Sequence, residues 1–272
     1  MFTTQRRKLA ASAQFDTAEA PVQYARMHES LGPNGRYAQA RMNLVHEILA
    51  DRPDGQLLDA GCGTGNLARS LLLSSRHDFS ITVTDRSQTM VRYCADSLRD
   101  LGKVRATVGD LECLPFTDAT FDVTLVTGAL EYTDAKKAIR ELARVTGRRG
   151  IVIVSMLNPT SPYRLVEWFL YWPVLRGFAV VQRQLRLRTR CPHGAVVSGI
   201  RARTVAELRC LMRRSGLRPT DLIYFDLTPL VPPLDRVPAL RRWVQRLPGM
   251  EARTRSWTRW LGTGYILVAE RA

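Results

Sequence analysis

The sequence predicts an α/β fold: a doubly wound, mostly parallel sheet of seven strands, with helical insertions after the fifth and sixth strands. One observation is the regular alternation of short apolar runs with amphipathic stretches between residues 56 and 156, which is typical of strands joined by helices. The other is the stretch QLLDAGCGTGNLARSLL, Gln56 to Leu72, in which an apolar run passes through three glycines into a helical pattern. Together they favour a Rossmann-like domain with its ligand at the carboxyl ends of the strands.

Breaking residues and periodicity place the elements in chain order. Residues 1–50 are expected to form an N-terminal arm, disordered or loosely docked up to Ala20, followed by one or two helices broken at Leu31 to Gly35. The remaining residues, 51–272, form the main domain. Strands are expected at 56–60, 79–84, 104–108, 121–127, 150–156, 220–226 and 264–270, and helices at 65–75, 87–101, 134–146 and 204–215.

Two insertions interrupt this alternation, at about residues 160–200 and 227–262. In the first, Glu167 and Arg176 bracket an apolar run that is shorter than the roughly 20 residues a membrane-spanning helix needs. Its apolar residues recur at helical spacing and predict one apolar face, which serves either as core or as the roof of an acceptor pocket. These residues are Leu165, Trp168, Phe169, Trp172 and Leu175.

The net charge of +15 is concentrated late in the chain. Up to Thr160 there are 20 Lys and Arg against 18 Asp and Glu, whereas from Ser161 onward there are 20 arginines, no lysine and 7 acidic residues. All five tryptophans also lie in this later part. Arginine with tryptophan suits anionic, aromatic or membrane-surface partners, and an arginine-rich solvated face would give the same composition.

Cysteine usage bears on the cellular compartment. The five cysteines form no Cys-x-x-Cys pair, and no secretion signal is found, which predicts reduced thiols and no metal site. We therefore expect a cytoplasmic protein, with peripheral contact to an anionic membrane surface as a further possibility. The sequence does not predict the oligomeric state.

The glycine turn indicates a nucleotide-like ligand with an anionic group at a helix N-terminus. Gly63, Gly65 and Ala68 also fit the dinucleotide spacing, so this stretch alone leaves the cofactor open. Asp85 ends the second strand, where a carboxylate can accept hydrogen bonds from ribose hydroxyls. Asp110 and Leu111 follow the third strand, where a carboxylate and a backbone N–H can bind the edge of an adenine.

With these motifs in order, residues 56–158 resemble the class I S-adenosylmethionine-dependent methyltransferases, particularly the ubiquinone and menaquinone branch. The stretch FDTAEAPVQY, Phe15 to Tyr24, resembles them loosely, and the insertions hardly at all. The resemblance implies S-adenosylmethionine as cofactor and S-adenosylhomocysteine as product. The cofactor-binding residues that it implies are Tyr24, Asp59, Gly61, Cys62, Gly63, Gly65, Asp85, Arg86, Met90, Gly109, Asp110, Leu111, Thr127 and Gly128.

Some of these residues have a structural alternative. Asp59 can hold the glycine loop by accepting backbone N–H groups instead of contacting the cofactor. Met90 can be ordinary core at helical spacing. Cys62 is expected to pack near the ligand without reacting, because nothing beside it in sequence would stabilise a thiolate.

Methyl transfer from a sulfonium is an in-line displacement that depends mainly on orientation. A general base is needed only if the attacking atom carries a proton, and the candidates are Glu131, Tyr132, His28 and His193. The fourth strand is followed by TGALEY and not by an Asn/Asp-Pro-Pro-aromatic or Pro-Cys motif, which disfavours methylation of nucleic-acid bases. The sequence therefore favours a small apolar, aromatic or lipid-like acceptor, with an RNA methyltransferase and a non-catalytic cofactor-binding regulator or partner subunit as alternatives.

Overall fold

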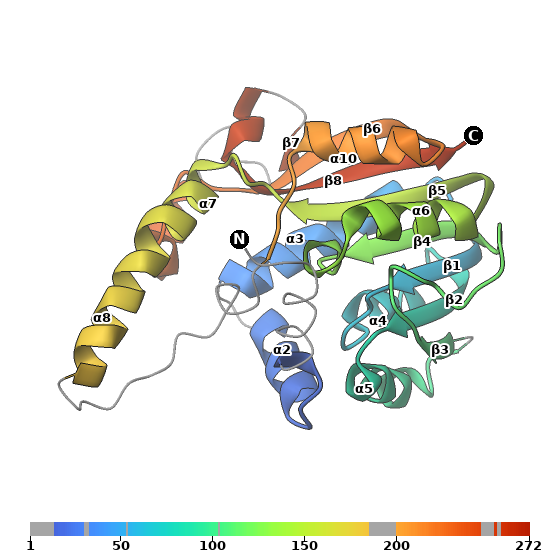
Figure 1. Cartoon of the computed structure of the whole chain (residues 1–272), viewed down its shortest axis with the longest axis horizontal. Helices are drawn as coiled ribbons and strands as arrows, with labels where there is room; N and C mark the ends of the chain where they lie inside the picture. Colours follow the sequence, from blue (N-terminus) through green and yellow to red (C-terminus); the bar gives the residue numbers. More distant parts are fainter. Residues whose placement is uncertain are drawn as a thin grey trace.

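The computed structural model describes residues 14–29, 33–52, 54–102, 104–184, 200–245, 253–254 and 257–272. One twisted sheet lies between helices on both of its faces (Figure 1). Its strand order is β3-β2-β1-β4-β5-β8-β6-β7, and β8 runs antiparallel to both of its neighbours, β5 and β6. The predicted mostly parallel seven-stranded sheet is confirmed, with a two-residue strand, β7, added at the edge beside β6.

The strands are β1 Asp54–Ala60, β2 Asp78–Asp85, β3 Val104–Val108, β4 Phe121–Thr127, β5 Thr146–Leu157, β6 Leu217–Leu227, β7 Arg253–Thr254 and β8 Gly262–Arg271. The α-helices are α2 Ala20–Glu29, α3 Pro33–Ile48, α4 Asn66–Leu72, α5 Gln88–Leu98, α6 Ala135–Val145, α7 Pro162–Val166, α8 Trp172–Gln184, α10 Val205–Arg214 and α11 Pro238–Gln245. Four shorter turns are η1 Leu130–Tyr132, the π-helical η2 Glu167–Tyr171, η3 Leu234–Arg236 and η4 Trp257–Leu261.

Local capping explains where several helices begin. Ser87 caps α5 by accepting from the backbone N–H of Met90, and Asp134 caps α6 in the same way. Thr204 and Glu207 form a capping box at α10. The predicted break at residues 31–35 is too long: α3 already begins at Pro33, because proline is well tolerated in the first helical turn.

Two apolar clusters fill the two faces of the sheet. One joins α6 and α10 to the strands through Leu142 and Met212. The other joins α3, α4 and α5 to the strands and includes Leu44, Leu71 and Leu98. Because α3 contributes directly to this cluster, the N-terminal helices pack as part of the same core as the sheet.

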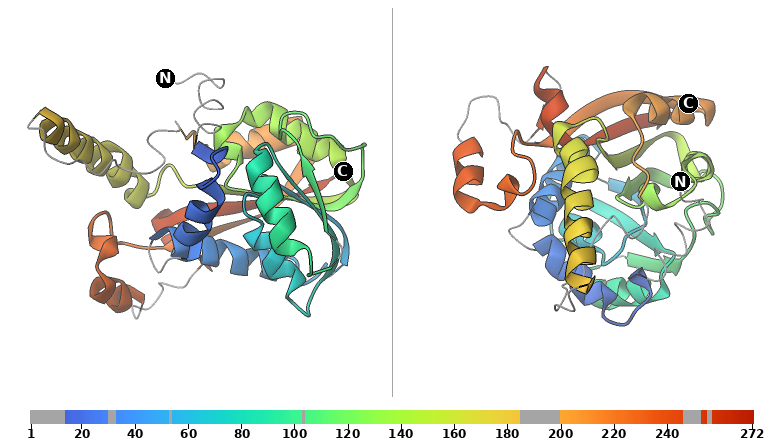
Figure 2. Two further views of the ribbon diagram at one scale, coloured as in Figure 1. Left: turned by 90° about the horizontal axis from the view of Figure 1, so that it is seen from below. Right: turned by 60° about the vertical axis from the view of Figure 1, so that its left-hand side comes forward.

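Both insertions leave the sheet at its carboxyl edge, after β5 and β6. The first forms a continuous run of helix, α7, η2 and α8, which extends away from the sheet (Figures 1 and 2). Leu165 is 43% exposed and Phe169 76% exposed, so the core alternative for this apolar face does not hold for these two residues. The reason is positional: the helix continues past the edge of the sheet, where the views show no strand beside it. None of the described helices is long and apolar enough to cross a membrane.

Candidate functional site

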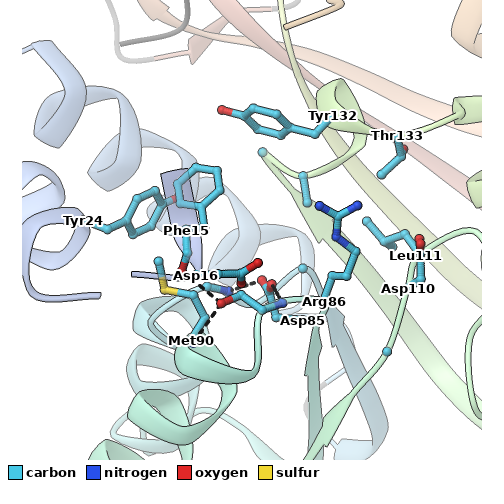
Figure 3. A pocket seen from close by; sticks show the side chains of 16 residues that line it. Phe15, Asp16, Tyr24, Asp85, Arg86, Met90, Asp110, Leu111, Tyr132 and Thr133 are labelled. Atoms are coloured by element: carbon cyan, nitrogen blue, oxygen red, sulfur yellow. Dashed lines mark hydrogen bonds between the residues drawn. The ribbon is translucent and has the colours of Figure 1, made fainter. Parts of the chain in front are cut away.

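A crevice of about 820 Å³, including its open mouth, lies where β1, β2, β3 and β4 end. It is lined by Phe15, Asp16, Tyr24, Gly61, Gly63, Asp85, Arg86, Ser87, Met90, Gly109, Asp110, Leu111, Gly128, Ala129, Tyr132 and Thr133. Ten of the fourteen residues predicted to bind the cofactor are in this set. The carboxyl edge of the strands therefore brings together residues that are as far apart in the sequence as Phe15 and Thr133 (Figure 3).

The glycine turn after β1 is held by backbone hydrogen bonds. The N–H groups of Gly61 and Cys62 both donate to the carbonyl of Thr84, at 2.7 and 3.0 Å. Gly61 has φ +79°, and a Cβ there would lie 2.3 Å from the Cβ of Ala129. A side chain at this position is therefore excluded, and the crevice wall at this point is bare backbone against which a ligand can lie.

Asp85 at the end of β2 accepts hydrogen bonds from the glycine turn after β1 and from the residue that begins α5. Its Oδ2 accepts from the N–H of Gly63 at 3.0 Å, and its Oδ1 accepts from the N–H of Ser87 at 2.9 Å. Burial raises the pKa of this carboxyl, although the hydrogen bonds from Ser87 and Gly63 oppose the shift. Each carboxylate oxygen has a further lone pair, so the group can still accept from two adjacent hydroxyls of a ligand.

Asp59 lies beneath the glycine turn and is 1% exposed. Neither carboxylate oxygen has a hydrogen-bond partner among the described residues. The alternative that Asp59 holds the glycine loop is therefore wrong: Thr84 and Asp85 hold it. Burial raises the pKa of Asp59 to about 7, against the attraction of the Arg41 guanidinium. A buried carboxylate without a partner is costly, which fits a site for a cationic group of a ligand.

Arg41 is a residue that the sequence analysis missed. It comes from α3 and reaches the end of β4, where its Nη1 lies 2.8 Å from the position of a Cβ on Gly128. Its charge acts on the carboxyls of Asp59 and Glu131. No motif marked this arginine, because its position depends on how α3 packs across the sheet.

Aromatic side chains close one side of the crevice. The ring of Phe15 meets the rings of Tyr24 and Tyr132 edge to face, with centroids 5.9 and 5.8 Å apart (Figure 3). The segment before α2 is thus docked from residue 14 onward, and the hydroxyl of Ser87 donates to the carbonyl of Phe15. Phe15 was quoted within the stretch that resembled the family but not chosen as a site residue.

The adenine end predicted from the sequence is built on the turn after β3. Met90 is buried on α5 and also lines the crevice, so it is part of the core and lies where its proposed contact with the cofactor would require. A Cβ on Gly109 would lie 2.8 Å from Thr84 Oγ1, which requires glycine there. Asp110 Oδ1 accepts from the N–H of Glu112 at 2.9 Å, and this fixes the carboxylate at the rim.

Four of the predicted residues lie outside this lining. Asp59 is beneath it, and Cys62 and Thr127 line a neighbouring groove against α3. Gly65 has a packing role, because a Cβ there would lie 2.4 Å from Cys94 Sγ. A hydrogen bond with Cys94 and burial raise the pKa of the Cys62 thiol, which agrees with a non-reactive cysteine.

The four candidates for a general base are placed differently. Tyr132 lines the crevice, whereas Glu131, on the same short turn η1, is 4% exposed and lies beneath it. Glu131 Oε2 has no hydrogen-bond partner among the described residues, and burial raises the pKa of this carboxyl against the attraction of Arg41. His28 belongs to α2, but its side chain, like the whole of His193, lies outside what the structure describes.

Comparison with known proteins identifies the kind of domain that carries this crevice. Residues 58–154 match the family model described as a methyltransferase domain. The chain is 35% identical over 123 residues to a demethylmenaquinone methyltransferase of Thermotoga maritima, covering 44% of this chain and 52% of that one. It is 28% identical over 210 residues to a malonyl-(acyl-carrier protein) O-methyltransferase of Herminiimonas arsenicoxydans, covering 76% and 72%.

Solved structures share the fold. A possible histamine N-methyltransferase of Thermotoga maritima superimposes with a TM-score of 0.61 at 18% identity, over 96% of this chain and all of that one. A geranyl diphosphate C-methyltransferase of Streptomyces coelicolor, solved with geranyl diphosphate and S-adenosylhomocysteine, gives a TM-score of 0.52 at 18% identity, over 85% of this chain and 79% of that one.

Residues 58–154 of the chain form a class I S-adenosylmethionine-dependent methyltransferase domain, and a domain of this class takes S-adenosylmethionine as its cofactor. Within the class, two of the curated relatives are by name a demethylmenaquinone methyltransferase and a ubiquinone/menaquinone biosynthesis C-methyltransferase, and this chain spans about half the length of the first of them. The unpartnered Asp59, the two-sided Asp85 and the bare glycine turn fit this cofactor.

Proposed function

We propose that this protein transfers a methyl group from S-adenosylmethionine to a small apolar acceptor of aromatic or lipid-like character. The observation that carries the proposal is the crevice at the carboxyl edge, in which a glycine turn, the Asp85 carboxylate and the Asp110 turn face one space. Asp59 supports it, because its buried and unpartnered carboxylate suits the ammonium of the methionine part.

The residues of the chain bind and orient the reactants in this proposal. S-adenosylmethionine supplies an activated methyl group whose sulfur leaves without needing a proton. Asp85 holds the ribose hydroxyls, the turn at Asp110 and Leu111 binds the adenine edge, and Met90 packs against the ring. Phe15, Tyr24 and Tyr132 cover the crevice and exclude water. Orientation of this kind contributes about 7–11 kcal/mol to lowering a barrier without acid or base.

Glu131 and Tyr132 are the proposed groups for an acceptor that carries a proton on its attacking atom. Burial raises the pKa of the Glu131 carboxyl, which favours proton uptake by this group, and Tyr132 faces the crevice. We infer that Glu131→Gln and Tyr132→Phe bind S-adenosylmethionine like the parent while turnover falls. If both variants keep full turnover, the reaction needs no base, or uses another one.

The acceptor class is supported by the relatives and by the second half of the chain. The demethylmenaquinone and geranyl diphosphate methyltransferases act by name on acceptors with apolar chains. The two insertions at the carboxyl edge carry aromatic residues, which can cover such a chain. Methylation of RNA and a purely regulatory, cofactor-binding role remain the competing hypotheses.

Two experiments test the proposal. Calorimetry should show S-adenosylmethionine and S-adenosylhomocysteine binding at low micromolar strength, about −8 kcal/mol. Tight binding of NADH without binding of either compound would contradict it. Incubation with labelled S-adenosylmethionine and a metabolite extract should then move label into an organic-soluble product. Label in added RNA instead would favour the RNA alternative, and binding without transfer to any fraction would favour the regulatory one.

A further inference from the structure

Two arms extend from the carboxyl edge and expose large apolar side chains. The first arm is the helix run α7, η2 and α8, residues 162–184, and the second arm is η3 and α11, residues 234–245. On the first arm Phe169 is 76% exposed and Phe178 63% exposed, and on the second arm Trp243 is 60% exposed. Leu165, Leu170, Val174, Leu234 and Val237 are exposed beside them. Such a gathering of apolar side chains marks an interaction surface.

The two arms project from the same end of the molecule. The views from below and from the side show both arms reaching beyond the sheet at the carboxyl edge (Figure 2). Their bases are joined, because the hydroxyl of Tyr163 in α7 donates to Asp235 Oδ2 in η3 at 2.7 Å, and both residues are buried. The two arms are thus held together at their bases, at the same end of the molecule.

The exposed charges on the described side chains of the two arms are positive. The arms contain two acidic residues, Glu167 and Asp235, and neither is available to a partner. Glu167 pairs with Arg164 at 2.5 Å, and Asp235 accepts from Tyr163 inside the joint. Arg176 and Arg242 are exposed on the two arms. The arms thus expose apolar and aromatic side chains together with arginines, and none of their described side chains is an exposed carboxylate. This composition is typical of an element that lies at a membrane interface.

We propose that the two arms dock this protein peripherally on an anionic lipid bilayer, with Phe169, Phe178 and Trp243 at the headgroup and acyl boundary. The arginines contact lipid phosphates, since guanidinium groups bind phosphate oxygens bidentately. A second copy of the chain fits this surface less well, because a symmetric pairing would bring arginines against arginines. The inference does not depend on the proposed methyl acceptor, since it concerns residues that do not line the crevice.

Vesicle sedimentation with the full chain tests the docking. The probe is phosphatidylglycerol and phosphatidylcholine vesicles compared with pure phosphatidylcholine vesicles. We expect binding to the anionic vesicles that falls at least tenfold when salt is raised to about 0.5 M, because screening shortens the reach of surface charge. Equal binding to neutral vesicles, or no binding at low salt by chain that still binds S-adenosylmethionine, would overturn the docking and leave the proposed function standing.

Matched variants identify the surface. Phe169→Glu/Phe178→Glu should lower vesicle binding at least tenfold, while Leu73→Glu, at an exposed apolar position of the sheet domain, should not change it. Arg176→Glu/Arg242→Glu should also weaken binding, whereas Lys136→Glu/Arg140→Glu, with the same change in net charge on α6, should weaken it less. Equal losses in the test and control variants would overturn the assignment to the arms. A dimer that Phe169→Glu/Phe178→Glu dissociates, without vesicle binding by the parent, would instead show that a second copy covers the arms.

Discussion

The crevice and the two arms use the same kinds of side chain in opposite ways. At the crevice, Phe15 packs its ring between two tyrosines, and the Asp85 carboxylate is held by two backbone N–H groups. On the arms, Phe169 faces solvent, and the acidic residues are turned inward against Arg164 and Tyr163. The crevice is therefore built to enclose a small polar ligand, and the arms are built to meet a large surface.

The difference follows from where each region lies relative to the sheet. Most crevice residues sit on strand ends and on the turns directly after them, where the backbone of the sheet fixes their positions. The arms begin at the same edge but continue beyond it, so the core cannot bury their apolar residues. Whether an apolar side chain of a helix is buried therefore depends on its distance from the sheet, and helical spacing alone does not decide it.

Removing the Asp85 carboxylate is expected to break the crevice most severely. In Asp85→Ala the N–H groups of Gly63 and Ser87 lose their acceptor, and the ligand loses the proposed partner of its ribose hydroxyls. Affinity for S-adenosylhomocysteine should fall at least about 100-fold, or about 2.7 kcal/mol, as expected for charge-assisted hydrogen bonds. Calorimetry measures it.

Asp78→Asn is the matched control, because Asp78 is an exposed carboxylate at the opposite end of the same strand. It should bind like the parent. If Asp85→Ala and Asp78→Asn behave alike, the crevice is not the cofactor site. Asp85→Asn keeps one oxygen that can accept from the backbone, so its affinity for S-adenosylhomocysteine is expected to lie between those of Asp85→Ala and Asp78→Asn.

Opening the aromatic side of the crevice is expected to have a smaller effect. Phe15→Ala removes two edge-to-face contacts, each worth about 0.5–1.5 kcal/mol, and so should weaken cofactor binding roughly tenfold. Phe15→Leu retains an apolar cover and should recover part of the loss. Unchanged affinity in both variants would mean that residues 14–20 do not close over the ligand.

The crevice could be predicted from the sequence to a greater extent than the arms, for a physical reason. The glycines and Asp85 were found from the sequence, because a strand end that must turn sharply and bind hydroxyls allows few residue types. Arg41 was missed, since it reaches Gly128 from a helix 87 residues earlier in the chain, and only the packing of α3 places it there. The sequence left core and pocket roof open for the Leu165 and Phe169 face for the same reason: helical spacing predicts an apolar stripe but not what lies opposite it.

Cofactor binding in the crevice is expected to depend on pH through Asp59. Its pKa of about 7 means that the carboxyl loses its proton as the pH rises through neutrality. A ligand ammonium favours the ionised form, so affinity for S-adenosylhomocysteine should increase several-fold from pH 6 to pH 7.5. Isothermal titrations across this range measure it.

Asp59→Asn should bind more weakly and lose this dependence, because it has no proton to release. A slope that persists in Asp59→Asn would assign the titration to another group, such as Asp85 or Glu131, whose pKa values burial also raises. Folding should respond with the opposite sign: a raised carboxyl pKa stabilises the folded state at low pH, and this contribution is lost as the pH rises through about 7.

The smallest expected effect is that of Phe169→Ala on the stability of the protein without membranes, and Phe79→Ala is the buried phenylalanine with which it is compared. Phe79 on β2 is 4% exposed, so Phe79→Ala should lower the free energy of unfolding by about 3–5 kcal/mol through the lost contacts and the cavity. Phe169 is 76% exposed, so Phe169→Ala should change it by less than about 0.5 kcal/mol. Urea unfolding followed by circular dichroism measures both. A loss at Phe169 close to that at Phe79 would show that the first arm folds back onto the domain in solution, and the surface proposed for the bilayer would then be part of the core.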